Sequence, residues 1–88
     1  MHLVLAQYDI LYRLAEIKTD TSAKVLVDIL LDENVHYQAH SAETLGDAIV
    51  RCGKPCLPYL QKIGKGHRQK YAADEMIKAI NEGRETFF

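Results

Sequence analysis

Tryptophan is absent from this chain of 88 residues, cysteine and proline occur twice each, and there is no long apolar run. Two cysteines do not make the disulfide framework that stabilises many small secreted domains. The apolar opening LVLA is interrupted at Gln7 and Asp9, and no later run approaches the roughly 20 apolar residues of a membrane-spanning helix. We therefore expect a protein with no cleavable leader that is soluble and cytoplasmic.

An excess of one charge is also absent. The chain has 11 lysines and arginines against 12 aspartates and glutamates, so its net charge of −1 predicts no non-specific binding to nucleic acid or to anionic membranes. The charges are nevertheless unevenly distributed. Residues 1–49 carry three basic and eight acidic side chains, whereas residues 50–88 carry eight basic and four acidic ones. This asymmetry favours contact between the first half of one molecule and the second half of another.

The apolar residues that are present recur at helical spacing rather than strand spacing. The first predicted helix has a broad apolar stripe. It contains Leu3, Ile10, Leu14 and Ile17 and is flanked by Val4, Leu11 and Ala15. Gly53 and Gly83 suit helix ends, and Pro55 suits the first turn of a helix. The sequence predicts one all-α domain over residues 1–88, with helices at about 2–18, 23–31, 35–52, 55–63 and 67–81.

The predicted helices repeat with a period of 31 residues. The shift aligns similar residues of the first, third and fifth helices, and two pairs of residues in the second and fourth helices. This periodicity predicts a two-layer stack of alternating helices, in which small residues let neighbouring helices approach closely. The aligned sets are Gln7, Gln38 and Gln69; Leu11, Ala42 and Ala73; Leu14, Leu45 and Met76; Ile17, Ala48 and Ala79; Ile49 and Ile80; Leu26 and Leu57; and Ile29 and Leu60.

Two segments of this repeat resemble a known family. The segment YQAHSAETLG (residues 37–46) is similar to the second-helix signature of HEAT-like repeats, and PCLPYL (residues 55–60) resembles the start of the following first helix. The resemblance covers about residues 23–80 and implies a short right-handed α-α superhelix of about five helices. The chain departs from the family where Arg is frequent, because Gln stands there in all three repeats and cannot form the charged pair that Arg makes.

A polar stripe is predicted on the repeated helices, opposite their apolar side. The resemblance implies that these helices line the concave side of the superhelix. One interpretation is a solvated face, which every surface helix has. The other is a face that binds a protein partner, because tyrosine is a frequent contact residue. We predict a protein-binding or scaffolding module that is not an enzyme and has no cofactor. The stripe residues are Tyr12, His36, His40, Glu43, Asp47, His67, Tyr71, Asp74 and Lys78.

Histidines within the stripe indicate an alternative function, a metal-dependent enzyme or a metal-binding protein. His36 and His40 are four residues apart, so both can point at one metal ion, and Glu43 or His67 can supply a third ligand. This arrangement is typical of zinc sites but is also common among exposed histidines. The His-Glu-x-x-His order of zinc proteases is absent.

Two other clusters each have a functional and a structural interpretation. One is a basic cluster, which predicts either a site for phosphate, nucleic acid or an acidic protein segment, or a solvated loop. Its residues are Lys62, Lys65, His67, Arg68 and Lys70.

The other cluster is the cysteine pair. Cys52 and Cys56 are either a redox pair or free buried thiols. The second interpretation is favoured, because three residues separate them and no strand precedes them.

The ends of the chain favour self-association. An open stack of repeats leaves the apolar sides of its first and last helices uncovered unless they are capped. We expect a homodimer that forms through the N-terminal helix or the Phe87-Phe88 tail. The alternative is that the tail folds back over the last helix and caps the stack within one molecule.

Overall fold

A computed structural model describes residues 3–32 and 39–86, and of residues 3–9 and 39–44 it describes the backbone alone. Within these ranges the chain is all-helical, which confirms the predicted fold class. The five predicted helices correspond in order to five α-helices, and a short 3-10 helix precedes the fourth. The elements are α1 (Leu3–Ile17), α2 (Asp20–Leu31), α3 (Ala39–Cys52), η1 (Lys54–Cys56), α4 (Leu57–Gln61) and α5 (Lys70–Asn81).

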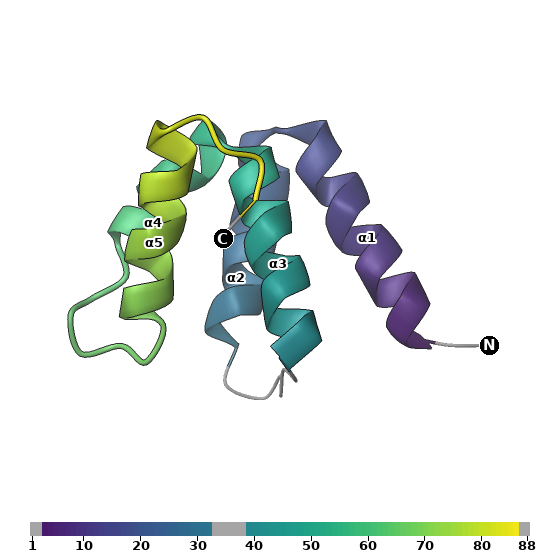
Figure 1. Ribbon diagram of the computed structural model, residues 1–88, viewed down its shortest axis with the longest axis horizontal. Helices are drawn as coiled ribbons and strands as arrows, with labels where there is room; N and C mark the ends of the chain where they lie inside the picture. The colour runs from purple at the N-terminus through teal and green to yellow at the C-terminus, as the bar shows by residue number, and fades with distance from the viewer. Residues whose placement is uncertain (1–2, 33–38, 87–88) are drawn as a thin grey trace.

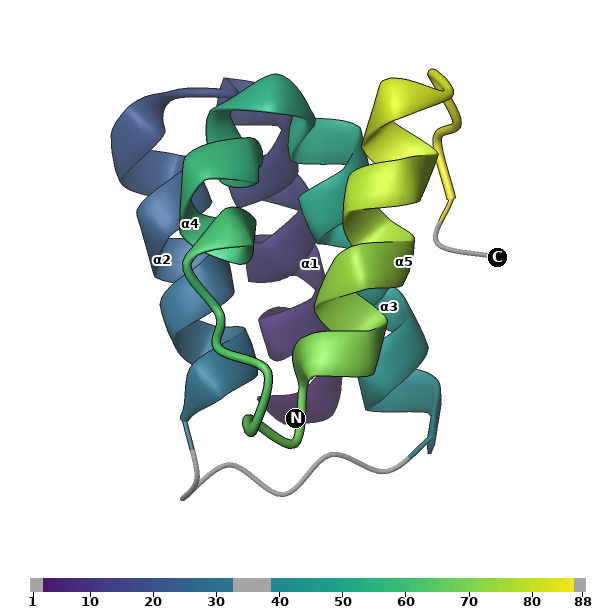
Figure 2. The same cartoon turned by 90° about the vertical axis from the view of Figure 1, so that its left-hand side faces the viewer.

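The helices form two layers. Figure 1 shows α3 lying between α1 and α5, with α2 and α4 behind them. In Figure 2 the second layer comes to the left, and η1 and α4 lie beside α2. This is the alternating arrangement that the 31-residue period predicts. Three neighbouring helices do not define a superhelical twist, so the right-handed superhelix stays a prediction.

One apolar core lies between the two layers. Residues that the repeat aligns are buried together, among them Leu45 with Met76 and Ile49 with Ile80. The repeated alanines Ala48 and Ala79 are completely buried, which allows the neighbouring helices to approach closely. The other buried apolar residues are Leu11, Ala15, Ala23, Leu26, Val27, Leu30, Val50, Cys52, Cys56, Leu60, Ile63 and Ala73.

The apolar stripe predicted for the first helix was partly wrong. Among the α1 side chains that the structure describes, the predicted flanking residues Leu11 and Ala15 are buried, whereas Ile10 is 54% exposed and Ile17 is 57% exposed. Ile17 aligns with Ala48 and Ala79, which are buried in α3 and α5. The difference follows from position, because α1 is the first helix of its layer and has a neighbour in that layer on one side only.

Helix α2 begins at Asp20, earlier than the predicted start at Ala23, because Thr19 caps it. The Thr19 hydroxyl oxygen accepts a hydrogen bond from the Ser22 amide at 3.1 Å, and the Ser22 hydroxyl oxygen accepts one from the Thr19 amide at 2.9 Å. This capping box has Ser where Glu or Gln is usual. Ser22 is buried, so the reciprocal bonds satisfy polar groups that water does not reach.

The turn after α3 depends on Gly53. Its φ of 83° and ψ of −137° lie in a region that side-chain-bearing residues rarely adopt. The Gly53 amide still donates to the Ile49 carbonyl at 3.0 Å, and the Gly53 carbonyl accepts from the Cys56 amide at 2.9 Å. The fourth predicted helix therefore starts as the 3-10 turn η1 and continues as the short helix α4.

Helix α5 begins at Lys70, three residues after the predicted start. His67 lies in a turn before the helix, and its Nδ1 accepts a hydrogen bond from the Gln69 amide at 3.0 Å. At the other end Gly83, with a φ of 75°, terminates the helix as predicted. The Arg84 amide donates to the Ala79 carbonyl and the Gly83 amide donates to the Ile80 carbonyl, which together form a Schellman motif.

The segment after α5 returns across the layer of α1, α3 and α5. Figure 1 shows it passing from the end of α5 to the front of α3. Arg84 and Glu85 share one hollow with Val50 and Arg51 of α3. The described part of the C-terminal segment thus lies toward α3, and Phe87-Phe88 lie outside the described residues.

Candidate functional site

The described members of the predicted stripe are exposed or partly exposed side chains of α1, α3 and α5, except His67, which lies in the turn before α5. Between Leu45 and Cys52 of α3, Asp47 is partly exposed, Arg51 is exposed and the remaining residues are buried. Helix α3 is flanked by α1 and α5 in its own layer and covered behind by α2. Asp47 and Arg51 are therefore the side chains that this part of the central helix presents outward.

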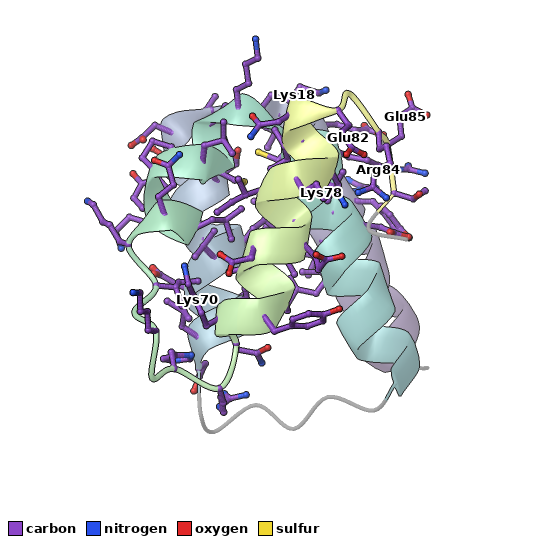
Figure 3. The ribbon with its side chains drawn as sticks, turned by 60° about the vertical axis from the view of Figure 1, so that its left-hand side comes forward. Lys18, Lys70, Lys78, Glu82, Arg84 and Glu85 are labelled. Carbon is purple, nitrogen blue, oxygen red and sulfur yellow. The ribbon has the colours of Figure 1, made fainter. Side chains whose placement is uncertain are left out.

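The flanking helices extend this surface. Tyr71 of α5 is 78% exposed, although it is a large aromatic residue in the first turn of a helix. Asp74 and Lys78 of the same helix are exposed, and Tyr12 of α1 is partly exposed. Figure 3 shows Lys70 at the start of α5 and Lys78 near its end.

Two contacts order side chains on this surface. The guanidinium carbon of Arg51 lies 5.2 Å from the centre of the Tyr12 ring, which makes a cation–π contact between α3 and α1. On α5 the Lys70 ammonium lies 2.9 Å from the Asp74 carboxylate. Arg51 was not among the predicted stripe residues. It could have been found from the sequence, because it lies one helical turn after Asp47.

The predicted metal site falls on residues that the structure does not describe. His36 lies outside the described residues, as do the side chains of His40 and Glu43. His67 is described, and its Nδ1 is occupied by the hydrogen bond from Gln69. Among the side chains that are described, no group of three or more metal-ligating residues comes together.

The basic cluster between Lys62 and Lys70 is largely engaged in contacts within the protein. Arg68 donates to the Asp32 carbonyl at 3.3 Å, and Lys70 pairs with Asp74. The Lys62 ammonium lies 5.7 Å from the centre of the Tyr59 ring. These contacts connect the loop to α2, α4 and α5, and they leave Lys65 as the most independent cation of the cluster.

The two cysteines are free and buried. Burial raises the pKa of the Cys56 thiol, and the adjacent Cys52 raises it further by Coulombic repulsion and a hydrogen bond. A raised pKa keeps the thiol protonated, and the thiolate is the reactive form. The described geometry therefore favours free structural thiols over a redox pair.

A hollow of about 460 Å³ opens between the ends of α1 and α3 and the C-terminal segment. Sequence reasoning did not predict this groove, because its residues come from separate parts of the chain. Ala15, Val50 and Ile80 supply apolar wall. The charged lining consists of the four cations Lys18, Arg51, Lys54 and Arg84 and the two carboxylates Glu16 and Glu85.

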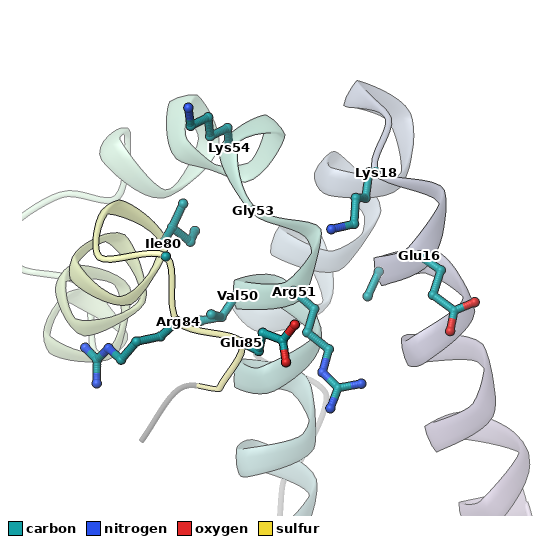
Figure 4. Close-up of a pocket in the computed structure, with 11 residues that line it drawn as sticks. Glu16, Lys18, Val50, Arg51, Gly53, Lys54, Ile80, Arg84 and Glu85 are labelled. Atoms are coloured by element: carbon teal, nitrogen blue, oxygen red, sulfur yellow. The ribbon is translucent and has the colours of Figure 1, made fainter.

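The charged side chains of the groove differ in orientation. Figure 4 shows Lys18 extending from the end of α1 toward α3, and Arg51 and Glu85 extending on the same side of α3. Lys54 and Arg84 point outward at the rim. The Arg84 Nε lies 3.1 Å from a Glu82 carboxylate oxygen. Lys18 and Lys54 form no ion pair with any side chain that the structure describes.

In the described ranges no helix is both long enough and apolar enough to cross a membrane. Comparison with protein-family models, with curated proteins and with solved structures finds no match. The resemblance to HEAT-like repeats therefore stays a prediction, and the function is argued from the residues of this chain.

Proposed function

We propose that this protein is a protein-binding or scaffolding module that holds its partner on the front of the α1, α3 and α5 layer. The described residues of this surface, called the partner face, are Tyr12, Asp47, Arg51, Tyr71, Asp74 and Lys78. Stacked helices suit this role, because side chains from several helices can contact one partner together.

The exposure of Tyr71 carries the proposal. A tyrosine that is 78% exposed on a regular helix leaves a large apolar ring in water. Tyrosine offers contact area and a hydrogen bond at low cost in side-chain entropy, and it is enriched at the energetic centres of interfaces. Tyr12 of α1 and Arg51 of α3 belong to the same class of contact residue, and the cation–π contact already orders the arginine.

The proposal is tested by affinity purification from the native host with two baits in parallel, the wild-type chain and Tyr71→Ala, with quantification by mass spectrometry. We expect at least one protein that the wild type recovers and the variant loses. Removal of a central interface tyrosine typically weakens binding by at least about tenfold. Direct titration of that protein then gives the affinity of each bait.

A third bait serves as a control. Val25→Ala removes a partly exposed apolar side chain from α2, in the other layer, where Val25 is 39% exposed. Tyr71→Ala and Val25→Ala should both retain the wild-type far-UV circular dichroism. A partner that is lost with Val25→Ala and retained with Tyr71→Ala contradicts the partner face.

Self-association through the N-terminal helix is a second proposal, supported by the exposure of Ile10 and Ile17. Both side chains are more than half exposed, and burying an isoleucine contributes about 1.5–3 kcal/mol before the cost of association. The dimer is expected to cover these two side chains. A contribution of Phe87-Phe88 concerns residues outside the described ranges.

Sedimentation equilibrium on the wild type and on the double variant Ile10→Lys/Ile17→Lys tests the dimer. We expect a dimer for the wild type at micromolar concentration and a monomer for the double variant, because the new ammonium groups resist burial. A wild-type monomer at low salt over the same range excludes the dimer. A cytoplasmic setting and the absence of enzymatic activity remain predictions of this proposal.

A further inference from the structure

The groove between α1, α3 and the C-terminal segment has more cations than carboxylates. Four cationic and two anionic side chains line it. The C-terminal ends of three helices open onto it, and each is equivalent to roughly half a negative charge. Because Arg84 pairs with Glu82 and the helix ends offset much of the remaining charge, the cations available to a ligand are Lys18 and Lys54, which pair with no described carboxylate.

Lys18 supplies one of these cations at the end of α1. It has a φ of 55°, a left-handed conformation that side-chain-bearing residues adopt less readily than glycine. Its side chain extends toward α3 across the mouth of the groove (Figure 4), and no described carboxylate pairs with it. A glycine would relieve the backbone but remove the charge.

Glu85 provides an independent indication of what the groove accepts. The C-terminal segment of this chain already places the Glu85 side chain in the lining, in front of α3, whereas the Arg51 guanidinium extends toward α1. Arg51 is presented by its contact with the Tyr12 ring, so its guanidinium is ordered before any ligand arrives. A carboxylate on an extended segment of chain is thus the chemistry that the groove already holds.

From these observations we propose that the groove binds an acidic peptide segment of the protein partner. Lys18 and Arg51 contact its carboxylates, Lys54 and Arg84 attract it from the rim, and Glu85 competes with it. This inference rests on the proposed function, because Arg51 belongs to both the groove and the partner face. It adds to the proposed function that the segment of the partner that binds in the groove is acidic.

The five glycines of the chain permit a test that does not require the partner. Gly53 and Gly83 line the groove, whereas Gly64 and Gly66 lie in the Lys62–Lys70 loop and Gly46 is buried in α3. Glycine amides occupy a distinct region of a ¹⁵N–¹H correlation spectrum. The probe is capped hexaglutamate, titrated at low salt. We expect saturable shifts at Gly53 and Gly83 that are absent at Gly64 and Gly66 and that fade at high salt.

Matched variants locate the charges responsible. Lys18→Gln/Lys54→Gln should weaken hexaglutamate binding by at least about threefold, whereas Lys62→Gln/Lys65→Gln, with the same change in net charge, should leave it within about twofold. Glu85→Gln should strengthen binding, because it removes the competing carboxylate. Glu75→Gln on α5 is its control and should cause no comparable gain. Circular dichroism verifies that each variant is folded.

Three results would overturn the inference. If only Gly64 and Gly66 shift, acidic segments bind the basic loop instead. If no glycine shifts, the groove is not a binding site for them. Equal shifts at Gly53 and Gly83 with inorganic phosphate at the same concentration indicate a site for free oxyanions. If hexaglutamate fails while Tyr71→Ala still loses the partner, the proposed function stands and this inference falls.

Discussion

Individual residues of this protein are constrained most strongly where the backbone has a positive φ. Among the described residues these are Lys18, Gly53 and Gly83. Gly83 serves a Schellman motif, and Lys18 accepts strain at the end of α1. Gly53 is the most restrictive of the three, because its ψ of −137° excludes the left-handed helical region that asparagine or lysine can adopt.

Gly53→Ala is therefore expected to lower the free energy of unfolding by about 1–3 kcal/mol. The cost comes from the backbone, because a Cβ at Gly53 would meet the nearest carbonyl oxygens at an ordinary 3.8 Å. Gly64→Ala is the control, since a Cβ there meets nothing within 4 Å. Urea denaturation measures both variants. Similar losses at the two positions would contradict a backbone constraint at Gly53.

The Cys56 thiol predicts how stability depends on pH. Burial raises its pKa above the ordinary value of 9.0, so the folded state binds a proton that the unfolded state releases near that value. The contribution to stability is complete below pH 9 and decreases as the pH rises. We expect unfolding measurements between pH 8 and 10 to show a loss of up to about 1.4 kcal/mol per pH unit above 9.

Cys56→Ala removes this titration and should make stability less dependent on pH over the same interval. Tyr59 also has a raised pKa, caused first by its hydrogen bond to Asp20, and contributes in the same direction at higher pH. The comparison between the wild type and Cys56→Ala isolates the thiol. An identical pH dependence in the two proteins would mean that the thiol does not titrate differently on unfolding.

At the scale of single elements, the helices differ in whether capping bonds or tertiary contacts hold them. Helix α4 has five residues, too few to be stable alone. It is held by the buried Leu60 and by a hydrogen bond of 2.7 Å that the Tyr59 hydroxyl donates to the Asp20 carboxylate of α2. Helix α2, in contrast, carries its own capping box.

Thr19→Ala should destabilise the protein by about 0.5–2 kcal/mol, because the Ser22 amide then loses its acceptor at the start of α2. Thr21→Ala makes the same chemical change two residues later at an exposed position and should stay within about 0.5 kcal/mol of the wild type. Thermal denaturation of both variants is the measurement. A larger effect for Thr21→Ala would place the start of α2 elsewhere.

At the scale of the whole molecule, α1, α3 and α5 form a row in which α1 and α5 each have one neighbour. Ala48 and Ile17 occupy equivalent positions of the repeat, yet the alanine is completely buried and the isoleucine is exposed. Ala48→Ile should overpack the interior of the row and cost about 1–3 kcal/mol. Ile17→Ala should change the stability of the monomer by no more than about 0.5 kcal/mol.

Urea denaturation measures the free energy of unfolding of both variants, at a concentration where the protein is monomeric. The comparison distinguishes an interior position from an edge position. The two variants exchange alanine and isoleucine in opposite directions at aligned positions, so the helix propensities of the two residues largely cancel in the comparison. If Ile17→Ala proves as destabilising as Ala48→Ile, the edge of α1 is covered in solution, and sedimentation equilibrium then identifies whether a second molecule covers it.

Local patterns in the sequence were sufficient for the fold class, the order of the helices and the helix end at Gly83, because apolar spacing and glycine preferences act within a few residues. Asp47, Tyr71, Asp74 and Lys78, which helical spacing placed opposite the apolar side, are exposed or partly exposed, and their role in binding stays a prediction. Starts of helices were less accurate. Thr19 and His67 act through specific side-chain hydrogen bonds that spacing does not reveal.

The exposed edge of α1 and the cationic groove depended on packing. The apolar spacing of α1 is compatible with either side facing the core, and the absence of a preceding helix in the layer leaves Ile10 and Ile17 exposed. The groove joins Lys18, Arg51 and Arg84 from distant parts of the chain. They meet because α1, α3 and α5 all finish at the same end of the layer. Side chains so far apart in the sequence produce no periodic pattern from which the groove could be predicted.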